Sequence, residues 1–322
     1  MRLCFVLLIS LFTSSLVIAD PLPSWVDAKS KQSIIEFVET VTDSSGDKFV
    51  PVADRIAVFD NDGTLWSEQP VYFQIFYALD RIQRLAKEDP SILTSDALKA
   101  ANKGDIKAVA AGGMSALTEV INLSHANISV TDFQADVKQW LKTARHPGTG
   151  LAYNHMVYQP MLELLSYLRD NDFKTYIVTG GGIHFVRAFA ESTYGIPPEQ
   201  VVGSQLNLAY ETSGSSSRMV KKPDIAFVDD GPGKPVAIDI HIGRKPIFAG
   251  GNSDGDFQML EWTSSNKLPN LAMIVHHTDA KREFSYDKKS HIGKLEKGMD
   301  QAADRGWLLV DMKNEWKSIY PE

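Results

Sequence analysis

The sequence has almost no cysteine and, beyond its first twenty residues, no long apolar run. Of its 322 residues only Cys4 is a cysteine, so no intramolecular disulfide can form. Basic residues do not predominate either, because 33 Lys and Arg stand against 40 Asp and Glu, for a formal charge of −7. This acidic balance gives no reason to expect nucleic acid or an anionic membrane surface as a partner.

The amino-terminal segment has the pattern of a secretory signal. Arg2 precedes an apolar stretch at 3–12, and the small residue Ala19 stands at the expected cleavage position before Asp20. The apolar stretch is shorter than the roughly 20 residues that span a bilayer. We therefore interpret residues 1–19 as a signal peptide. We expect an exported protein, periplasmic or secreted, with no stable membrane insertion after cleavage.

The remaining sequence has the composition of a globular protein, with 43% hydrophobic and 23% charged residues, and its length indicates one large or two smaller domains. Several short apolar runs lack the polar alternation of a half-exposed strand, and helical patterns such as 161–173 separate some of them. Strands buried on both faces have this pattern. It predicts an α/β fold with a doubly wound, Rossmann-like parallel sheet. The runs are 56–59, 175–180, 246–251, 271–277 and 307–312.

One long segment does not fit a simple crossover between strands. More than a hundred residues separate the first run from the second, and they show helical patterns without a clear strand. A crossover needs only a dozen or more residues. We therefore expect a helical subdomain inserted at 67–153, with the core formed by 20–66 and 154–322. The low-complexity stretch 212–218 is expected to be a hairpin tip or a surface loop.

Three of the apolar runs end in polar residues that suit phosphate chemistry. The first leads into Asp60 and Asp62, the second ends in Thr179 and three glycines, and the third leads into GNSDGD at 251–256. Ligands bind beyond the carboxyl ends of parallel strands. A divalent cation such as Mg²⁺ offsets the repulsion between close carboxylates, and Thr-Gly-Gly-Gly offers free N–H groups to an anion. The set predicts phosphoryl transfer.

In this order, the motifs resemble those of the haloacid dehalogenase superfamily, in its phosphatase branch. DNDGT at 60–64 is similar to the first motif, D-x-D-G-T, and IVTGG at 177–181 to the second. A lysine before the last acidic cluster is similar to the third and fourth. The helical insert resembles the mobile cap of the phosphoserine-phosphatase-like group. The resemblance implies a Mg²⁺-dependent phosphomonoester hydrolase that acts on a small phosphorylated metabolite through an aspartyl-phosphate.

The resemblance also implies roles for individual residues. Asp60 is expected to be the nucleophile. Asp62 is expected to protonate the leaving oxygen and then to activate water, while its backbone carbonyl contacts Mg²⁺. Thr179, Gly180 and Gly181 are expected to hold the transferring phosphoryl group. Dehalogenases of the superfamily lack the second aspartate and need no metal, so Asp62 favours the phosphatase branch.

The choice of the third-motif lysine stays open among four candidates. Lys234 fits best, because it lies twenty residues before Asp254 and is followed by a plausible helix start. Lys221, Lys222 and Lys245 are the alternatives.

The fourth motif departs from the family pattern. Alignment of GNSDGD with G-D-x-x-x-D places Asn252 where a metal-binding aspartate is expected. An amide oxygen can bind Mg²⁺ without adding charge, so Asp254 or Asp256 is expected to supply the anionic contact. The implied metal ligands are Asp60, Asp62, Asn252 and Asp254, with Asp256 behind them.

A possible substrate pocket adjoins the first and second motifs. Trp66, Glu68 and Gln69 follow the catalytic loop, and His184 follows the glycines. In phosphoserine phosphatases a glutamate shortly after the first motif holds the substrate amine, but here Glu68 stands one position early. Two alternatives therefore stay open beside a phosphatase of moderate or broad specificity: a narrow phosphoserine phosphatase, and an inactive phosphate-binding protein, which only Asn252 supports. The sequence does not indicate the oligomeric state.

The signal-peptide interpretation makes a direct prediction. Mass spectrometry of the protein purified from its native source is expected to show a chain that begins at Asp20. Intact Met1 on protein taken from native membranes would contradict cleavage and favour an anchored form.

Overall fold

The computed structural model describes residues 20–322, and the expected signal peptide lies outside the described residues. A seven-stranded sheet in the order β4-β3-β2-β1-β5-β6-β7 forms the centre of the fold. All neighbouring strands are parallel except β3 and β4, which are antiparallel. The α/β fold is confirmed. The strands are β1 (Ile56–Phe59), β2 (Lys174–Gly182), β3 (Val201–Ser213), β4 (Ser216–Phe227), β5 (Phe248–Gly251), β6 (Leu271–His276) and β7 (Leu308–Asp311).

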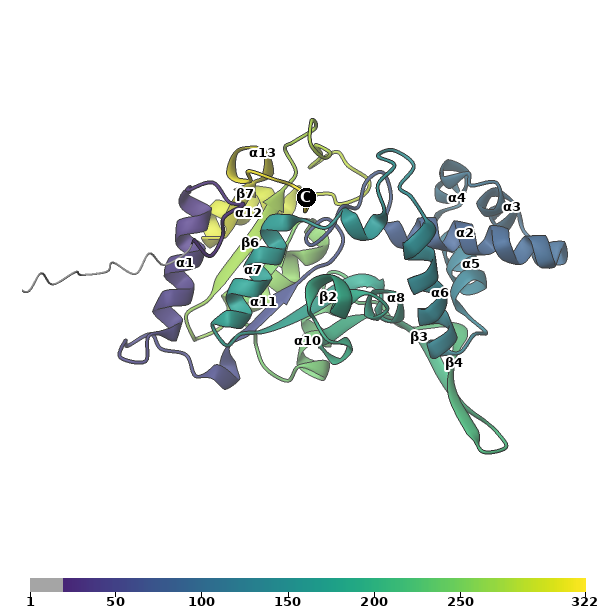
Figure 1. Cartoon of the computed structure of the whole chain (residues 1–322), viewed down its shortest axis with the longest axis horizontal. Coiled ribbons are helices and arrows are strands. Elements are labelled where there is room, and N and C mark those ends of the chain that lie inside the picture. Colours follow the sequence, from purple (N-terminus) through teal and green to yellow (C-terminus); the bar gives the residue numbers. More distant parts are fainter. Residues whose placement is uncertain (1–19) are drawn as a thin grey trace, which may run out of the picture.

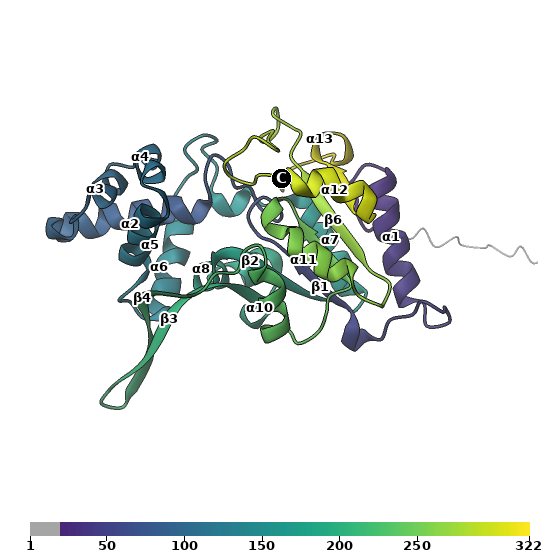
Figure 2. The same ribbon diagram turned by 180° about the vertical axis from the view of Figure 1, so that it is seen from behind.

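Helices cover both faces of the sheet, which explains the continuous apolar runs (Figures 1 and 2). Along β1, Ile56 and Val58 pack into the core on the side of α10, α11 and α12. The alternate residues Ala57 and Phe59 pack into the core on the side of α1 and α7. A strand buried on both faces has no polar positions to alternate. These helices are α1 (Lys29–Thr42), α7 (Gln159–Asp170), α10 (Gly233–His241), α11 (Phe257–Ser264) and α12 (Lys297–Arg305).

The sequence located five strands and missed two. Each predicted apolar run coincides with a strand, and the first and last residues of run and strand differ by at most two positions. The missed strands, β3 and β4, form a long hairpin that projects from the body of the molecule (Figure 1). Much of this hairpin is exposed, with Leu208, Tyr210 and Met219 on its surface, so it has no buried apolar run. Its tip falls within 212–218, as the low-complexity stretch predicted.

Between β1 and β2 the chain forms a group of helices, in the segment where an inserted subdomain is expected. In both views these helices lie at the end of the molecule opposite α1 (Figures 1 and 2). They have an apolar core of their own, with Leu79, Ile82 and Val120 in it. We call residues 67–153 the helical insert. Its helices are α2 (Phe73–Glu88), α3 (Asp96–Asn102), α4 (Ile106–Ala111), α5 (Gly113–His125) and α6 (Val130–Thr143).

The helical insert is joined to the projecting hairpin by backbone hydrogen bonds. The N–H of Lys221 in β4 donates to the carbonyl of Ile128 (3.0 Å), and the N–H of Asn127 donates to the carbonyl of Lys221 (2.7 Å). This pairing places the side chains of β4 beside those of the helical insert. Among the described residues, no helix combines the length and the apolar character that crossing a membrane requires.

Asp254, in the loop after β5, caps a helix from a distant part of the chain. Its carboxylate accepts hydrogen bonds from the N–H groups of Glu296 (3.1 Å), Lys297 (3.1 Å) and Gly298 (2.9 Å), at the start of α12. The first N–H groups of a helix have no partner within it, and a negative charge there also suits the helix dipole. Because these contacts occupy the carboxylate, we no longer assign Asp254 as a metal ligand.

This cap predicts a loss of stability without a metal effect. Replacing Asp254 by Ala is expected to lower the free energy of unfolding by about 1 kcal/mol, as measured by urea denaturation. Asp304→Ala, at an exposed position of the same helix, is the matched control and is expected to change it by no more than about 0.5 kcal/mol. Equal stability of the two variants would contradict the capping role.

Candidate active site

Lys234 contacts residues of three neighbouring strands near the carboxyl edge of the sheet. Its ammonium lies 2.7 Å from Asp60 Oδ1, directly after β1, and 2.8 Å from Asp256 Oδ1, after β5. It also donates to the carbonyl of Val178 in β2 (2.8 Å). All three charged side chains are buried. The structure thus brings together the expected nucleophile and the preferred lysine, with Asp256 behind them.

Buried carboxylates outnumber cations around this lysine. Burial, followed by repulsion from Asp256, raises the pKa of Asp60 above its usual value, although Lys234 opposes the shift. Burial alone would lower the pKa of Lys234, but Asp256, Asp60 and Asp229 raise it. Asp229, which the sequence analysis did not single out, is fully buried, and burial raises its pKa to about 7. The site therefore has an excess of negative charge.

Asp62 is held between its own loop and the glycines at the end of β2. Its Oδ1 accepts a hydrogen bond from Trp66 Nε1 (2.8 Å), and burial raises its pKa to about 6. Between the two residues Gly63 has a positive φ of 73°, which lets the loop turn back on itself. A Cβ atom added to Gly181 would lie 3.5 Å from Asp62 Oδ2 and 3.2 Å from Thr179 Oγ1. The acid therefore faces the expected phosphate cradle.

The cradle itself is built from Thr179 and its glycines. Thr179 Oγ1 accepts a hydrogen bond from the N–H of Gly181 (3.0 Å). The N–H of Gly182 donates to Gln74 Oε1 (2.8 Å), near the start of α2 in the helical insert. Because a glycine carries no side chain, other groups can approach the backbone closely here. Gln74 is a contact between insert and core that the sequence analysis missed.

Asn252 contacts the first-motif loop on both sides of its amide. Its Oδ1 accepts from Thr64 Oγ1 (3.1 Å), and its Nδ2 donates to Glu68 Oε1 (2.7 Å). Asp256 Oδ2 accepts from the N–H groups of Asn252 (2.9 Å) and Ser253 (3.1 Å). Asp256 therefore orients both Lys234 and the Asn252 backbone. The carboxyl group of Glu68 lies directly behind the neutral amide.

Glu68 is buried rather than open to a substrate. Besides the amide of Asn252, it accepts a hydrogen bond from the Tyr286 hydroxyl (2.8 Å). Its side chain is 1% exposed, and burial raises its pKa to about 7. These contacts occupy the Glu68 carboxyl group inside the protein, so it is not in a position to bind a substrate amine.

A buried histidine contacts the backbone of the loop that follows β1. His277 Nε2 contacts the carbonyl of Gly63 (2.7 Å), and Nδ1 contacts Glu283 Oε2 (3.2 Å). Because both nitrogens face acceptors, both must carry protons for both hydrogen bonds to form. Burial alone would lower the pKa of His277, but Glu283 raises it. The sequence gives no signal for this contact, because 214 residues separate His277 from Gly63.

The remaining expected pocket residues lie near the site in different ways. Trp66 is fully buried and stacks on Phe189, with ring centroids 4.6 Å apart, so it positions Asp62 instead of lining an open pocket. Gln69 Nε2 donates to the carbonyl of Ile292 (3.0 Å). His184 is buried at the start of the helix after the glycines.

The alternative lysines do not reach Asp60. Lys222 pairs with Glu211 on the neighbouring strand (2.8 Å). Lys245 donates to Ser265 Oγ (2.9 Å) on the surface. Lys221 is buried, but its ammonium lies 3.5 Å from His184 Nδ1. Of the four candidates, the structure brings Lys234 to Asp60.

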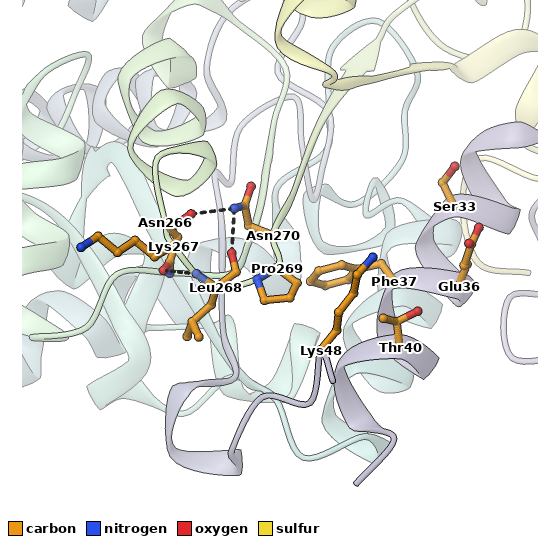
Figure 3. A pocket seen from close by; sticks show the side chains of 10 residues that line it. All are labelled: Ser33, Glu36, Phe37, Thr40, Lys48, Asn266, Lys267, Leu268, Pro269 and Asn270. Atoms are coloured by element: carbon orange, nitrogen blue, oxygen red, sulfur yellow. Dashed lines mark hydrogen bonds between the residues drawn. The ribbon is translucent and has the colours of Figure 1, made fainter. Parts of the chain in front are cut away.

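An open hollow of about 620 Å³ lies elsewhere, between α1 and the loop before β6 (Figure 3). It is lined by residues that include Phe37, Lys48 and Asn270. Because Asn270 directly precedes β6, the hollow lies at the amino ends of the parallel strands, opposite the edge that carries Asp60. It is therefore separate from the candidate active site.

Comparisons with known proteins concern the fold and the family of the chain. A conserved protein of unknown function from Anaerococcus prevotii DSM 20548 is similar over 91% of this chain and 94% of its own, with 16% identity and a TM-score of 0.57. A protein of unknown function from Bordetella pertussis Tohama I is similar over 80% of this chain and 98% of its own, with 15% identity and a TM-score of 0.49.

A phosphoserine phosphohydrolase-like protein from Francisella tularensis subsp. tularensis SCHU S4 is similar over 69% of this chain and 87% of its own, with 17% identity and a TM-score of 0.36. No curated protein sequence matches the chain. The family model of haloacid dehalogenase-like hydrolases, however, matches residues 57–261, well over half of the sequence. The chain therefore belongs to the haloacid dehalogenase-like hydrolase family.

Proposed function

We propose that the protein is a Mg²⁺-dependent phosphomonoester hydrolase that acts on a small phosphorylated metabolite through an aspartyl-phosphate. One observation carries the proposal. The buried carboxylate of Asp60 is fixed by Lys234 at 2.7 Å, at the strand end where Asp62 faces the Thr179–Gly181 cradle. A nucleophile, an acid and an anion cradle thus meet at one edge of the sheet.

The residues can divide the reaction into two displacements. Asp60 attacks phosphorus and forms a P–O bond, while Asp62 gives its proton to the ester oxygen that leaves. Asp62 then takes a proton from water, which attacks phosphorus, releases inorganic phosphate and restores the Asp60 carboxylate. The Thr179 hydroxyl and the N–H of Gly180 hold the phosphoryl oxygens, and Lys234 offsets their charge. Trp66 keeps Asp62 in place throughout.

The donor atoms at the site fit Mg²⁺. Residues 20–322 contain no group of three or more His, Cys, Asp or Glu side chains that could hold a metal by themselves. Mg²⁺ commonly takes one or two protein carboxylates and fills its other positions with water and substrate oxygens. The Asp60 carboxylate, the Asp62 carbonyl and the Asn252 amide oxygen would hold it. The ion would supply the positive charge that the excess of buried carboxylates lacks.

The two alternatives have less support. A narrow phosphoserine phosphatase needs a group for the substrate amine, and Glu68 is buried against Asn252 and Tyr286. An inactive binding protein would need neither a nucleophile nor an acid, and the 2.7 Å contact between Lys234 and Asp60, with Asp62 nearby, supports the catalytic function instead. Hydrolysis of a panel of phosphate monoesters, with and without Mg²⁺, separates the three functions.

Removal of the nucleophile is expected to abolish turnover. Asp60→Asn keeps the side-chain volume but removes the attacking oxygen, so kcat is expected to fall at least about a thousandfold, as measured by phosphate release from para-nitrophenyl phosphate with Mg²⁺. Asp96→Asn, at an exposed acid of the helical insert, is the control and should keep wild-type rates. Hydrolysis by Asp60→Asn at a rate near that of wild type would exclude the covalent route.

The Asn252–Glu68 pair predicts how the metal affinity can be raised. Asn252→Asp alone would place a second carboxylate beside Glu68, at the 2.7 Å contact. Adding Glu68→Gln restores an N–H donor at that contact. The double variant has the same total charge as the wild type, but the negative charge moves from position 68 to position 252, beside the proposed metal site. The double variant is therefore expected to bind Mg²⁺ about tenfold more tightly.

Isothermal titration of Mg²⁺ into the protein without substrate measures this change. Glu68→Gln alone serves as the control, because it removes the same charge without moving it and is expected to weaken binding. A double variant that binds Mg²⁺ no better than Glu68→Gln would show that Asn252 does not face the ion.

A further inference from the structure

A second polar cluster lies between the helical insert and the core. The Lys221 ammonium, from β4, lies 4.1 Å from the centroid of the Phe133 ring in α6. It also lies 3.5 Å from Nδ1 of His184, in α8 (Ile183–Arg187). Lys221 is 3% exposed and His184 is 7% exposed. We call the following residues the Lys221 cluster: Gln74, His125, Phe133, His184 and Lys221.

The Lys221 cluster adjoins the phosphate cradle. Gln74 accepts a hydrogen bond from the N–H of Gly182 through Oε1, and its Nε2 lies 2.8 Å from His125 Nε2. The centroids of the His125 and Phe133 rings are 5.0 Å apart, and the Lys221 ammonium lies over the face of the Phe133 ring. His184 follows Gly182 by two residues. A continuous line of contacts therefore leads from the glycine cradle to a buried cation.

Among the described residues, this cation has no acidic partner. No Asp or Glu of residues 20–322 lies within ion-pair distance of the Lys221 ammonium, whereas the adjacent Lys222 pairs with Glu211 at 2.8 Å. An ammonium has three N–H donors, and here a single long contact to His184 uses one of them. Burial of an unpaired charge is costly. With the Phe133 ring face also in contact, at least one donor remains for a group that residues 20–322 do not supply.

The neighbouring histidines do not compensate the charge. Burial, and then the nearby Lys221, lowers the pKa of both His184 (to about 3) and His125. Both rings are therefore neutral at neutral pH, and each can donate or accept a hydrogen bond. Burial also lowers the pKa of Lys221 to about 8, which still leaves most of it protonated. The cluster combines one positive charge with neutral polar groups, as an anion site requires.

We propose that Lys221 binds a second anionic group of the substrate, so that the enzyme prefers small phosphomonoesters whose carbon chain also carries a carboxylate or a further phosphate. The inference rests on the phosphatase function proposed above and specifies its substrate class. With the ester phosphate in the cradle, the chain of the substrate extends toward α6 and β4. There the second anion accepts charge-assisted hydrogen bonds from the Lys221 ammonium, with His184 beside it.

Matched substrates test this preference. One pair is 3-phosphoglycerate and glycerol 3-phosphate, which differ only by a carboxylate or a hydroxymethyl group at the far carbon. The other is phosphoglycolate and 2-hydroxyethyl phosphate. The measured quantity is the ratio of kcat/KM within each pair. The wild-type ratio is expected to favour the carboxylate by about tenfold or more in at least one pair.

Substitutions at Lys221 are expected to change this ratio selectively. Lys221→Met keeps the length and apolar stem but removes the charge, and should lower the ratio about tenfold or more. Lys221→Gln is a second neutral variant, in case Met does not fold. Lys221→Arg keeps the charge and should retain the preference, and Lys222→Met, at the adjacent lysine, is the matched control. A purely structural role would lower both members of each pair equally, which would overturn the proposal, as would a wild-type enzyme without preference.

A binding measurement separates failure of this inference from failure of the phosphatase function. If the wild-type protein hydrolyses none of the four esters, the proposed function fails. Titration calorimetry of 3-phosphoglycerate and glycerol 3-phosphate, in the presence of Mg²⁺, then decides the inference alone. Tighter binding of 3-phosphoglycerate to wild type, lost in Lys221→Met and kept in Lys222→Met, supports the anion site. Equal binding of the two compounds to the wild-type protein overturns it.

Discussion

The contact on which the active site depends is the buried ion pair between Lys234 and two carboxylates. Asp60 follows β1 and Asp256 follows β5, so the lysine fixes the relative position of two neighbouring strand ends. Removing one partner of a buried pair leaves an uncompensated charge, which is strongly destabilising. The lysine holds Asp60, the proposed nucleophile, and Asp256 in turn holds the backbone of Asn252. One cation thus organises the loops that make the site.

The sheet edge and the Lys221 cluster carry buried charges of opposite sign. At the sheet edge, Asp60, Asp229 and Asp256 surround Lys234 and leave an excess of negative charge that a divalent cation can offset. Beyond the glycine cradle, Lys221 is a buried cation, and no carboxylate of residues 20–322 pairs with it. The proposed substrate, with a phosphate ester at one end and a second anion at the other, would match both when a divalent cation offsets the carboxylates. The proposed chemistry and the proposed substrate class therefore follow from the same electrostatic reasoning.

The sequence predicted those features that depend on residues close together in the chain. A strand covered on both faces is a continuous apolar run, and the motif residues follow such runs. The strands β1, β2 and β5 and the meeting of their polar ends at one edge of the sheet were therefore predictable. The half-exposed hairpin of β3 and β4 has no such run and was missed. Contacts that form only by folding left no signal. The spacing of GNSDGD could not show that Asp254 caps a helix start more than forty residues later. The contact of His277 with the Gly63 carbonyl could not be predicted from the sequence either.

The central claim is that Asp60 carries the phosphoryl group during turnover. Rapid-quench mixing of the protein with a ³²P-labelled phosphomonoester and Mg²⁺, followed by peptide mapping in acid, tests it most directly. The account predicts a transient label on the peptide that contains Asp60, released by hydroxylamine as an acyl phosphate is and absent from Asp60→Asn. Turnover of the labelled ester without any label on that peptide, at times shorter than one catalytic cycle, would contradict the account.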